Sequence, residues 1–178
     1  MNIGLLVLRL VVGGLFYGHG TQKLFGWFQG HGPDGTGGFL ESLGYRPGRP
    51  MAIVAGATEA GAGMLLILGL FTPLAAAMIV GVMINATMAV HAGKGVWNSN
   101  GGYELPLVMS AAAACLAYVG PGSISVDRFI GGPFQSYLYG TAAIALGIIV
   151  GIAVHSLRRE EVVSEQREER EQRRERAA

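Results

Sequence analysis

The sequence has almost no cysteine, since Cys115 is the single one among 178 residues. One thiol excludes an intrachain disulfide, a CxxC redox pair and a cysteine-rich metal site. The four histidines show no compact metal-ligand spacing with the acids, so no metal site is predicted. A haem held by His19 and His91 has only the residue types in its favour. Any redox role of the chain is therefore expected to be non-thiol.

Charge is also scarce over most of the chain. Residues 1–157 carry six basic and five acidic side chains, whereas seven of each sign follow Leu157. These are too few to cover the surface of a water-soluble globule of that size, so lipid is the expected solvent. No basic patch or stripe indicates nucleic-acid binding. The N-terminus lacks the basic region and cleavage site of a signal peptide, and Arg9 interrupts its apolar segment, so a retained first span is expected.

Long hydrophobic runs, by contrast, are numerous. A helix needs roughly 20 mostly apolar residues to cross a hydrocarbon core of about 30 Å. Five segments approach that length, at residues 3–24, 51–70, 73–92, 103–119 and 137–157. We predict an all-α membrane protein, in which an antiparallel four-helix transmembrane bundle is followed by a fifth C-terminal transmembrane helix. The predicted units are residues 1–136 for the bundle with its loops, 137–157 for the additional helix and 158–178 for a charged tail.

Turn residues and small residues predict how the spans connect and pack. Thr72 is the expected N-cap and Pro73 the first helical residue of the third span, which predicts an antiparallel hairpin with the second. The Gly-rich segment 25–50 contains GGFLESLGY, which is predicted as a short amphipathic helix at the membrane interface. Small residues permit close helix contacts, and they recur in three spans, as Gly14 and Gly18, as Ala52, Gly56 and Ala60, and as Gly147 and Gly151.

Basic residues predict the orientation of the chain in the inner (plasma) membrane. A cytoplasmic C-terminus and five spans place the N-terminus outside, and the outer loops then contain only Arg128. The bases on the cytoplasmic side are Lys23, Arg46, Arg49, Lys94, Arg158 and Arg159. The tail after Leu157 has almost no apolar residues and is interpreted as a solvated extension. A helix continued from the fifth span and a partner-binding coiled coil are the alternatives.

Two charged residues fall inside the predicted spans, where an ionised side chain is costly unless it is paired or faces a wet cavity. Glu59 lies near the middle of the second span, and Arg9 lies roughly 7 Å outward of the middle of the first. An extended Arg side chain spans that gap, which predicts an ion pair between Arg9 and Glu59. The pair would serve either as a structural specificity device or as a proton or ligand site, with Glu59 as a candidate catalytic residue.

A second group of polar residues is expected at the cytoplasmic ends of the spans. His19 and Lys23 lie one helical turn apart, His91 closes the third span and Glu104 opens the fourth. Each has a plain explanation alone: packing for His19, a snorkelling anchor for Lys23 and the helix dipole for Glu104. Together they would form a pocket for a quinone head group, a small anion or proton transfer, with His19 as a second candidate catalytic residue. The aromatic residues nearby would wall this pocket or form an interfacial belt, namely Phe16, Tyr17, Phe25, Trp27 and Phe28.

Three stretches carry a resemblance to a known family: LRLVVGGLFYGHGTQKLFG, TEAGAGMLLILGLFTPLAA and NGGYELPLVMSAAAACLAYVGPGSISVDR. Over about residues 3–128 the chain resembles the DoxX family of small bacterial membrane proteins. The resemblance implies a four-helix integral membrane unit, and the fifth span and charged tail depart from that pattern. Polar residues of the family pattern fall at Arg9, His19, Lys23, Glu59, Glu104 and Asp127.

The resemblance implies a role beside a membrane oxidoreductase. Family members are described as small subunits of such enzymes, including enzymes that pass electrons from thiosulfate to quinone. The first hypothesis is therefore a non-thiol subunit or accessory of a quinone-linked redox system, with a membrane or cytoplasmic oxidoreductase as partner, rather than a self-sufficient enzyme. No cofactor-binding motif is evident, and a quinone is compatible with the polar pocket. The hypothetical ligand-binding residues are Arg9, His19, Lys23, Glu59, His91 and Glu104.

Two other classes of function stay open. A structural scaffold or assembly partner would use the buried charges only to fix helix register. A small proton-coupled transporter would use Glu59, but a chain of this size without evident inverted repeats would need to form a homo-oligomer.

Overall fold

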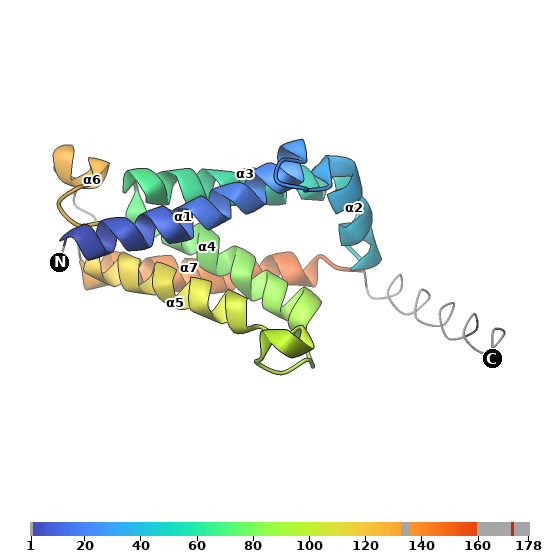
Figure 1. Ribbon diagram of the computed structural model, residues 1–178. Helices are drawn as coiled ribbons and strands as arrows, with labels where there is room; N and C mark the ends of the chain where they lie inside the picture. The colour runs from blue at the N-terminus through green and yellow to red at the C-terminus, as the bar shows by residue number, and fades with distance from the viewer. Residues whose placement is uncertain (1, 133–135, 160–171, 173–178) are drawn as a thin grey trace.

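All the regular secondary structure of the described residues is helical. The computed structural model describes residues 2–132, 136–159 and 172, and all but residues 158, 159 and 172 of the charged tail lie outside this set. Five long helices run along one axis, with short helices at both ends (Figure 1). The elements are α1 (Asn2–Phe25), α2 (Gly32–Ser42), α3 (Gly48–Leu68), α4 (Thr72–Ala86), the π-helical turn η1 (Thr87–His91), the 3-10 turn η2 (Asn98–Asn100), α5 (Glu104–Val119), α6 (Val126–Phe129) and α7 (Tyr137–Ser156).

The predicted class of fold, an all-α membrane protein, is confirmed. Within the described residues, four helical segments are long and apolar enough to cross a membrane: α1, α3, α4 continued through η1, and α7. The fourth predicted span is α5, which has 16 residues and is therefore shorter than the roughly 20 residues of a full span. At helical rise, 16 residues cover about 24 Å. Large apolar side chains are exposed on these helices, including Ile3, Val54 and Ile149, as lipid-facing surfaces require.

The long helices pack in two layers. Helix α1 lies along α3, while α5 and α7 pack on α4, and the α3–α4 hairpin joins the two layers (Figure 1). The core between them is apolar, with Phe16 from α1, Leu66 from α3, Ile79 from α4 and Leu116 from α5 among its buried members. The antiparallel hairpin of the second and third predicted spans is therefore confirmed as α3 and α4.

Small residues set the contact between α1 and α3, at the predicted Gly56 and Ala60 on α3 but not at the predicted glycines on α1. A Cβ on Gly20 would come within 2.3 Å of Ala60 N, and one on Gly63 within 2.4 Å of Tyr17 N. Neither Gly14 nor Gly18 would meet any atom within 4 Å. The prediction of a Gly14–Gly18 contact is therefore wrong, because the rotation of α1 about its axis turns these two residues away from α3. The predicted close contact of Gly147 and Gly151 is confirmed, since both press on the backbone of α4.

The turn between α3 and α4 is held from a distant part of the chain. Phe71, in a left-handed conformation with φ 47, precedes α4, and Thr72 is its first residue. The expected N-cap role of Thr72 is wrong, since its hydroxyl donates to Asp127 Oδ2 at 2.8 Å. The backbone N–H groups of Phe71 and Thr72 also donate to the Asp127 carboxylate, at 2.8 and 3.0 Å. Asp127, on α6, thus caps α4 in place of a local side chain.

The predicted short helix in segment 25–50 exists and begins earlier than expected, at Gly32. This helix, α2, crosses the end of the bundle where α1 stops and α3 begins (Figure 1). It packs against both α1 and α3. The helix therefore closes one side of the space beyond the C-terminal turn of α1, where the candidate site lies.

Candidate functional site

Arg9 and Glu59 do not pair with each other, so that prediction is wrong. Arg9 is buried, and its Nη1 and Nη2 donate to the carbonyl oxygens of Pro121 and Ile124, each at 2.7 Å. The cause is the antiparallel register of α1 and α3, which places Arg9 against Gly69 at the far end of α3. Gly69 follows Glu59 by ten positions along α3 and its cap, which corresponds to about 15 Å at helical rise. Arg9 therefore fastens the loop before α6 to α1.

Glu59 pairs instead with Lys23, the last basic residue of α1. The Nζ of Lys23 lies 2.6 Å from Oε2 of Glu59, and the side chains are 27% and 7% exposed. Leu24, the residue after Lys23, lies against Gly56 on α3. Glu59 follows Gly56 by about one helical turn, so it lies deeper in the bundle than the backbone of Lys23. The Lys23 side chain therefore extends inward, which is the opposite of a snorkelling anchor.

The His19 side chain does not bond this ion pair, although the His19 backbone carbonyl accepts a hydrogen bond from Lys23. Its Nδ1 is 3.0 Å from Oε1 of Gln22, and the Gln22 amide donates to the Phe28 carbonyl at 3.1 Å. The backbone carbonyl of His19 is 3.5 Å from Lys23 Nζ. These contacts tie the turn after α1 to the C-terminal end of the helix, so His19 supports the position of Lys23 through the backbone.

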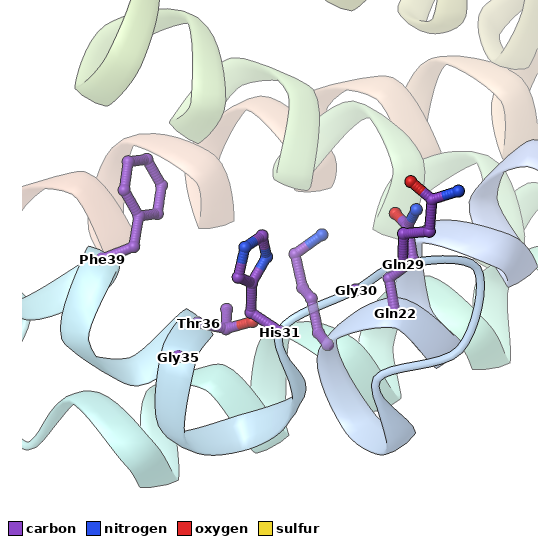
Figure 2. A pocket seen from close by; sticks show the side chains of 8 residues that line it. Gln22, Gln29, Gly30, His31, Gly35, Thr36 and Phe39 are labelled. Carbon is purple, nitrogen blue, oxygen red and sulfur yellow. The ribbon is translucent and has the colours of Figure 1, made fainter.

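A recess of about 470 Å³ opens between α1 and α2 next to Lys23. Figure 2 shows His31 between Phe39 on α2 and the amides of Gln22 and Gln29. The lining contains ammonium, amide, imidazole and hydroxyl groups and no carboxylate, its members being Gln22, Lys23, Gln29, Gly30, His31, Gly35, Thr36 and Phe39. Such a lining favours a ligand with acceptor oxygens, because nearly all its polar side chains can donate hydrogen bonds.

His91 ends η1 and Glu104 begins α5. The α4–α5 connection between them lies at the same end of the bundle as the recess but across it from α1 (Figure 1). His91 Nδ1 is 2.7 Å from the Gly101 carbonyl, and Glu104 Oε2 accepts a hydrogen bond from Asn98 N at 2.9 Å. Both side chains thus hold their own connection together. The structure brings Lys23 and Glu59 into one site with His19 beside it, and it leaves His91 and Glu104 out.

One polar cluster was not predicted from the sequence. Tyr45 is 2% exposed and donates from its hydroxyl to Asn85 on α4. Burial raises the pKa of the Tyr45 phenol, although the bond to Asn85 and the charge of Arg158 lower it, so the phenol stays neutral and donates. Arg158 lies over the Tyr45 ring and donates from Nε to the Leu43 carbonyl at 2.7 Å. The only signal for this cluster in the sequence was Asn85, a polar residue inside an apolar run.

The comparisons with known proteins agree with this architecture. The DoxX family model matches residues 4–92, half of the chain. The chain belongs to the DoxX family. A second family model, TQO small subunit DoxD, matches residues 49–150 and extends into α7. Through this match the chain is a membrane protein related to quinol oxidoreductase subunits.

Two curated relatives cover most of the chain. Inner membrane protein YphA of Escherichia coli (strain K12) is 33% identical over 133 residues, which is 70% of this chain and 88% of that protein. An uncharacterized protein of Haemophilus influenzae is 38% identical over 125 residues, which is 68% of this chain and 86% of that protein. No solved structure matches the chain. The relatives support a location in the membrane and do not add an activity.

Proposed function

We propose that this DoxX protein is the membrane subunit of a quinone-linked oxidoreductase, and that it holds the quinone head group in the recess beside Lys23 and Glu59. The DoxD match supports the link to a quinone system. A soluble or membrane partner would supply the electrons. In this proposal the quinone is the substrate, which takes up two electrons and two protons to become the quinol.

The inward ion pair of Lys23 and Glu59 is the observation that carries this proposal. Charged side chains inside a membrane are costly and usually mark a ligand or ion pathway. A purely structural ion pair does not need to lie next to a recess. Lys23, however, both lines the recess and bonds Glu59. The ammonium is thus within reach of a bound head group as well as of the carboxylate.

The rest of the recess fits a quinone head group. Quinone carbonyls accept hydrogen bonds, and Lys23, His31 and the glutamine amides can donate them. Phe39 lines the recess and offers an apolar face for the ring. Ligand sites with a few convergent polar groups on a mostly apolar wall are the usual pattern for such ligands.

The test is to purify the full chain from its own membranes in mild detergent and to measure bound quinone by extraction and mass spectrometry. We expect the wild type to retain quinone and K23M to lose at least about tenfold of it, as expected when one charge-assisted hydrogen bond is removed. The matched control is K94M, because Lys94 is an exposed lysine of the α4–α5 connection. Equal quinone in K23M and K94M would contradict the proposal. A quinone-free wild type that still retains a partner protein would favour the scaffold.

A further inference from the structure

We propose that binding of a head group in the recess is coupled to uptake of one proton by Glu59. The inference rests on the proposed quinone site and adds how that site responds to its ligand. Lys23 serves as the donor to Glu59 in the empty site and as the donor to the ligand in the occupied one. Glu59 takes up a proton when Lys23 leaves it.

The geometry gives Glu59 one partner. Among the described residues, Lys23 is the only side chain that bonds the Glu59 carboxylate, at 2.6 Å. The Glu59 side chain is 7% exposed, whereas the Lys23 side chain is 27% exposed and reaches the recess. Lys23 is therefore the single polar connection from Glu59 to the space a ligand would enter.

The other charged groups on the helices around Glu59 are already engaged. On α1, Arg9 bonds the loop before α6, and His19 bonds Gln22. On α2, Glu41 accepts from Gly48 N, and Asp34 pairs with Arg49 of α3 on the exposed surface. Helix α4 has no acidic, basic or histidine residue. His31, directly before α2, lines the recess together with Lys23. Among the described residues no cation other than Lys23 bonds Glu59.

Moving Lys23 to a ligand oxygen leaves a buried carboxylate with no counter-ion. Burial disfavours the charged form, so the carboxylate takes a proton from solvent. In this step a proton joins one Glu59 carboxylate oxygen and the ammonium keeps its three hydrogens, while no electron moves. Because the bound state holds one more proton, ligand affinity falls as pH rises, by up to about tenfold per pH unit.

Calorimetry of the full chain in detergent tests this coupling. Decylubiquinone is titrated at one pH in buffers of different ionisation enthalpy, which yields the number of protons taken up per ligand bound. We expect uptake approaching one in the wild type and in D34N, whose carboxylate is exposed. We expect no uptake in E59Q, with affinity as tight as the wild type or tighter, because Lys23 is then free for the ligand. An infrared band of a protonated carboxyl group should appear on binding in the wild type and be absent in E59Q.

Two results would overturn the coupling: binding of decylubiquinone by the wild type without proton uptake, or uptake that persists in E59Q. Failure of the wild type to bind decylubiquinone would overturn the quinone site as well, so the two failures are distinguishable. K23M/E59Q removes both charges and leaves no lone buried ion. It should keep its helical circular dichroism and elution volume while losing binding, which separates the role of the pair from a folding defect.

Discussion

Asp127 connects three helices at one end of the bundle through its hydrogen bonds. Its carboxylate accepts from Phe71 N, Thr72 N and the Thr72 hydroxyl, and its own backbone N–H donates to the Gly69 carbonyl at 2.9 Å. The residue is 2% exposed. A single side chain thus joins α6 to the start of α4 and to the end of α3.

Asp127→Ala should therefore be strongly destabilising. It removes the acceptor for three donors near the start of α4, and buried donors left without a partner cost about 1–3 kcal/mol each. We expect a loss of about 2–4 kcal/mol in the free energy of unfolding, measured by denaturant titration in detergent. Asp34→Ala is the control, because its pair with Arg49 lies at the surface and should change stability by less than about 1 kcal/mol. Similar losses in both variants would contradict the capping role.

At the scale of elements, the contact between α1 and α3 depends on glycines that let the two backbones approach. Gly63→Ala places a methyl group 2.4 Å from Tyr17 N, so the helices must separate. We expect a loss of about 1–3 kcal/mol, as for other overpacked positions. Gly14→Ala meets open space and should leave the unfolding free energy unchanged or slightly raised, because Ala favours helix over Gly. Equal effects of the two substitutions would show that this helix register is incorrect.

A second contact between elements joins the end of α7 to the α2–α3 loop. The Arg158 side chain donates to the Leu43 carbonyl, whereas Arg159 bonds the Gly44 carbonyl through its backbone N–H. Arg158→Ala should lower the midpoint of thermal unfolding by a few degrees, since a hydrogen bond from a charged group is worth about 1.5–3 kcal/mol. Arg159→Ala removes the same charge and keeps its backbone bond, so little change is expected. A larger effect of Arg159→Ala would contradict this assignment.

At the scale of the whole molecule, the two ends of the bundle differ in chemistry. One end holds the buried Arg9 and Asp127 contacts, and the other holds the Lys23–Glu59 pair and the recess. We expect the recess to face the cytoplasm, because the flanking basic residues gather at its end. A quinone partner enzyme would then meet the protein on the cytoplasmic side.

Cysteine labelling tests this orientation. In a C115A background, Ser99→Cys in η2 should react with a membrane-impermeant maleimide only after the cells are opened, and Ser123→Cys before α6 should react in intact cells. Both serines are exposed, and Ser to Cys changes little volume. The reverse pattern of labelling would invert the orientation and place the recess outside.

The sequence predicted the spans but not how they face one another. Hydropathy located the long helices, because a span must be apolar over its whole length. It gave neither the axial register of α1 against α3 nor the rotation of each helix, since these are set by packing between helices. For this reason the sequence pattern pairs Arg9 with Glu59, whereas the partner of Glu59 in the structure is Lys23. It likewise predicts a helix contact at Gly14 that the structure makes at Gly13 and Gly20.

The sequence predicts some residues of the candidate site but not the full set that forms it. Lys23, Glu59 and His19 were identified because charged and imidazole groups are rare in apolar spans. The recess could not be predicted, because His31, Thr36 and Phe39 line it only once α2 has packed against the bundle. The sequence predicts His91 and Glu104 in the site because they share its end of the bundle, but it does not tell which side of the bundle a loop occupies.

Photo-cross-linking tests the central claim, a quinone head group in the recess beside Lys23, most directly. The full chain in detergent is irradiated with a photoreactive benzoquinone, digested and mapped by mass spectrometry. We predict label within residues 22–39, competed by decylubiquinone, strongly reduced in K23M and unchanged in K94M. Label at the Arg9 end of the bundle, or label in the recess that K23M leaves unchanged, would contradict the account.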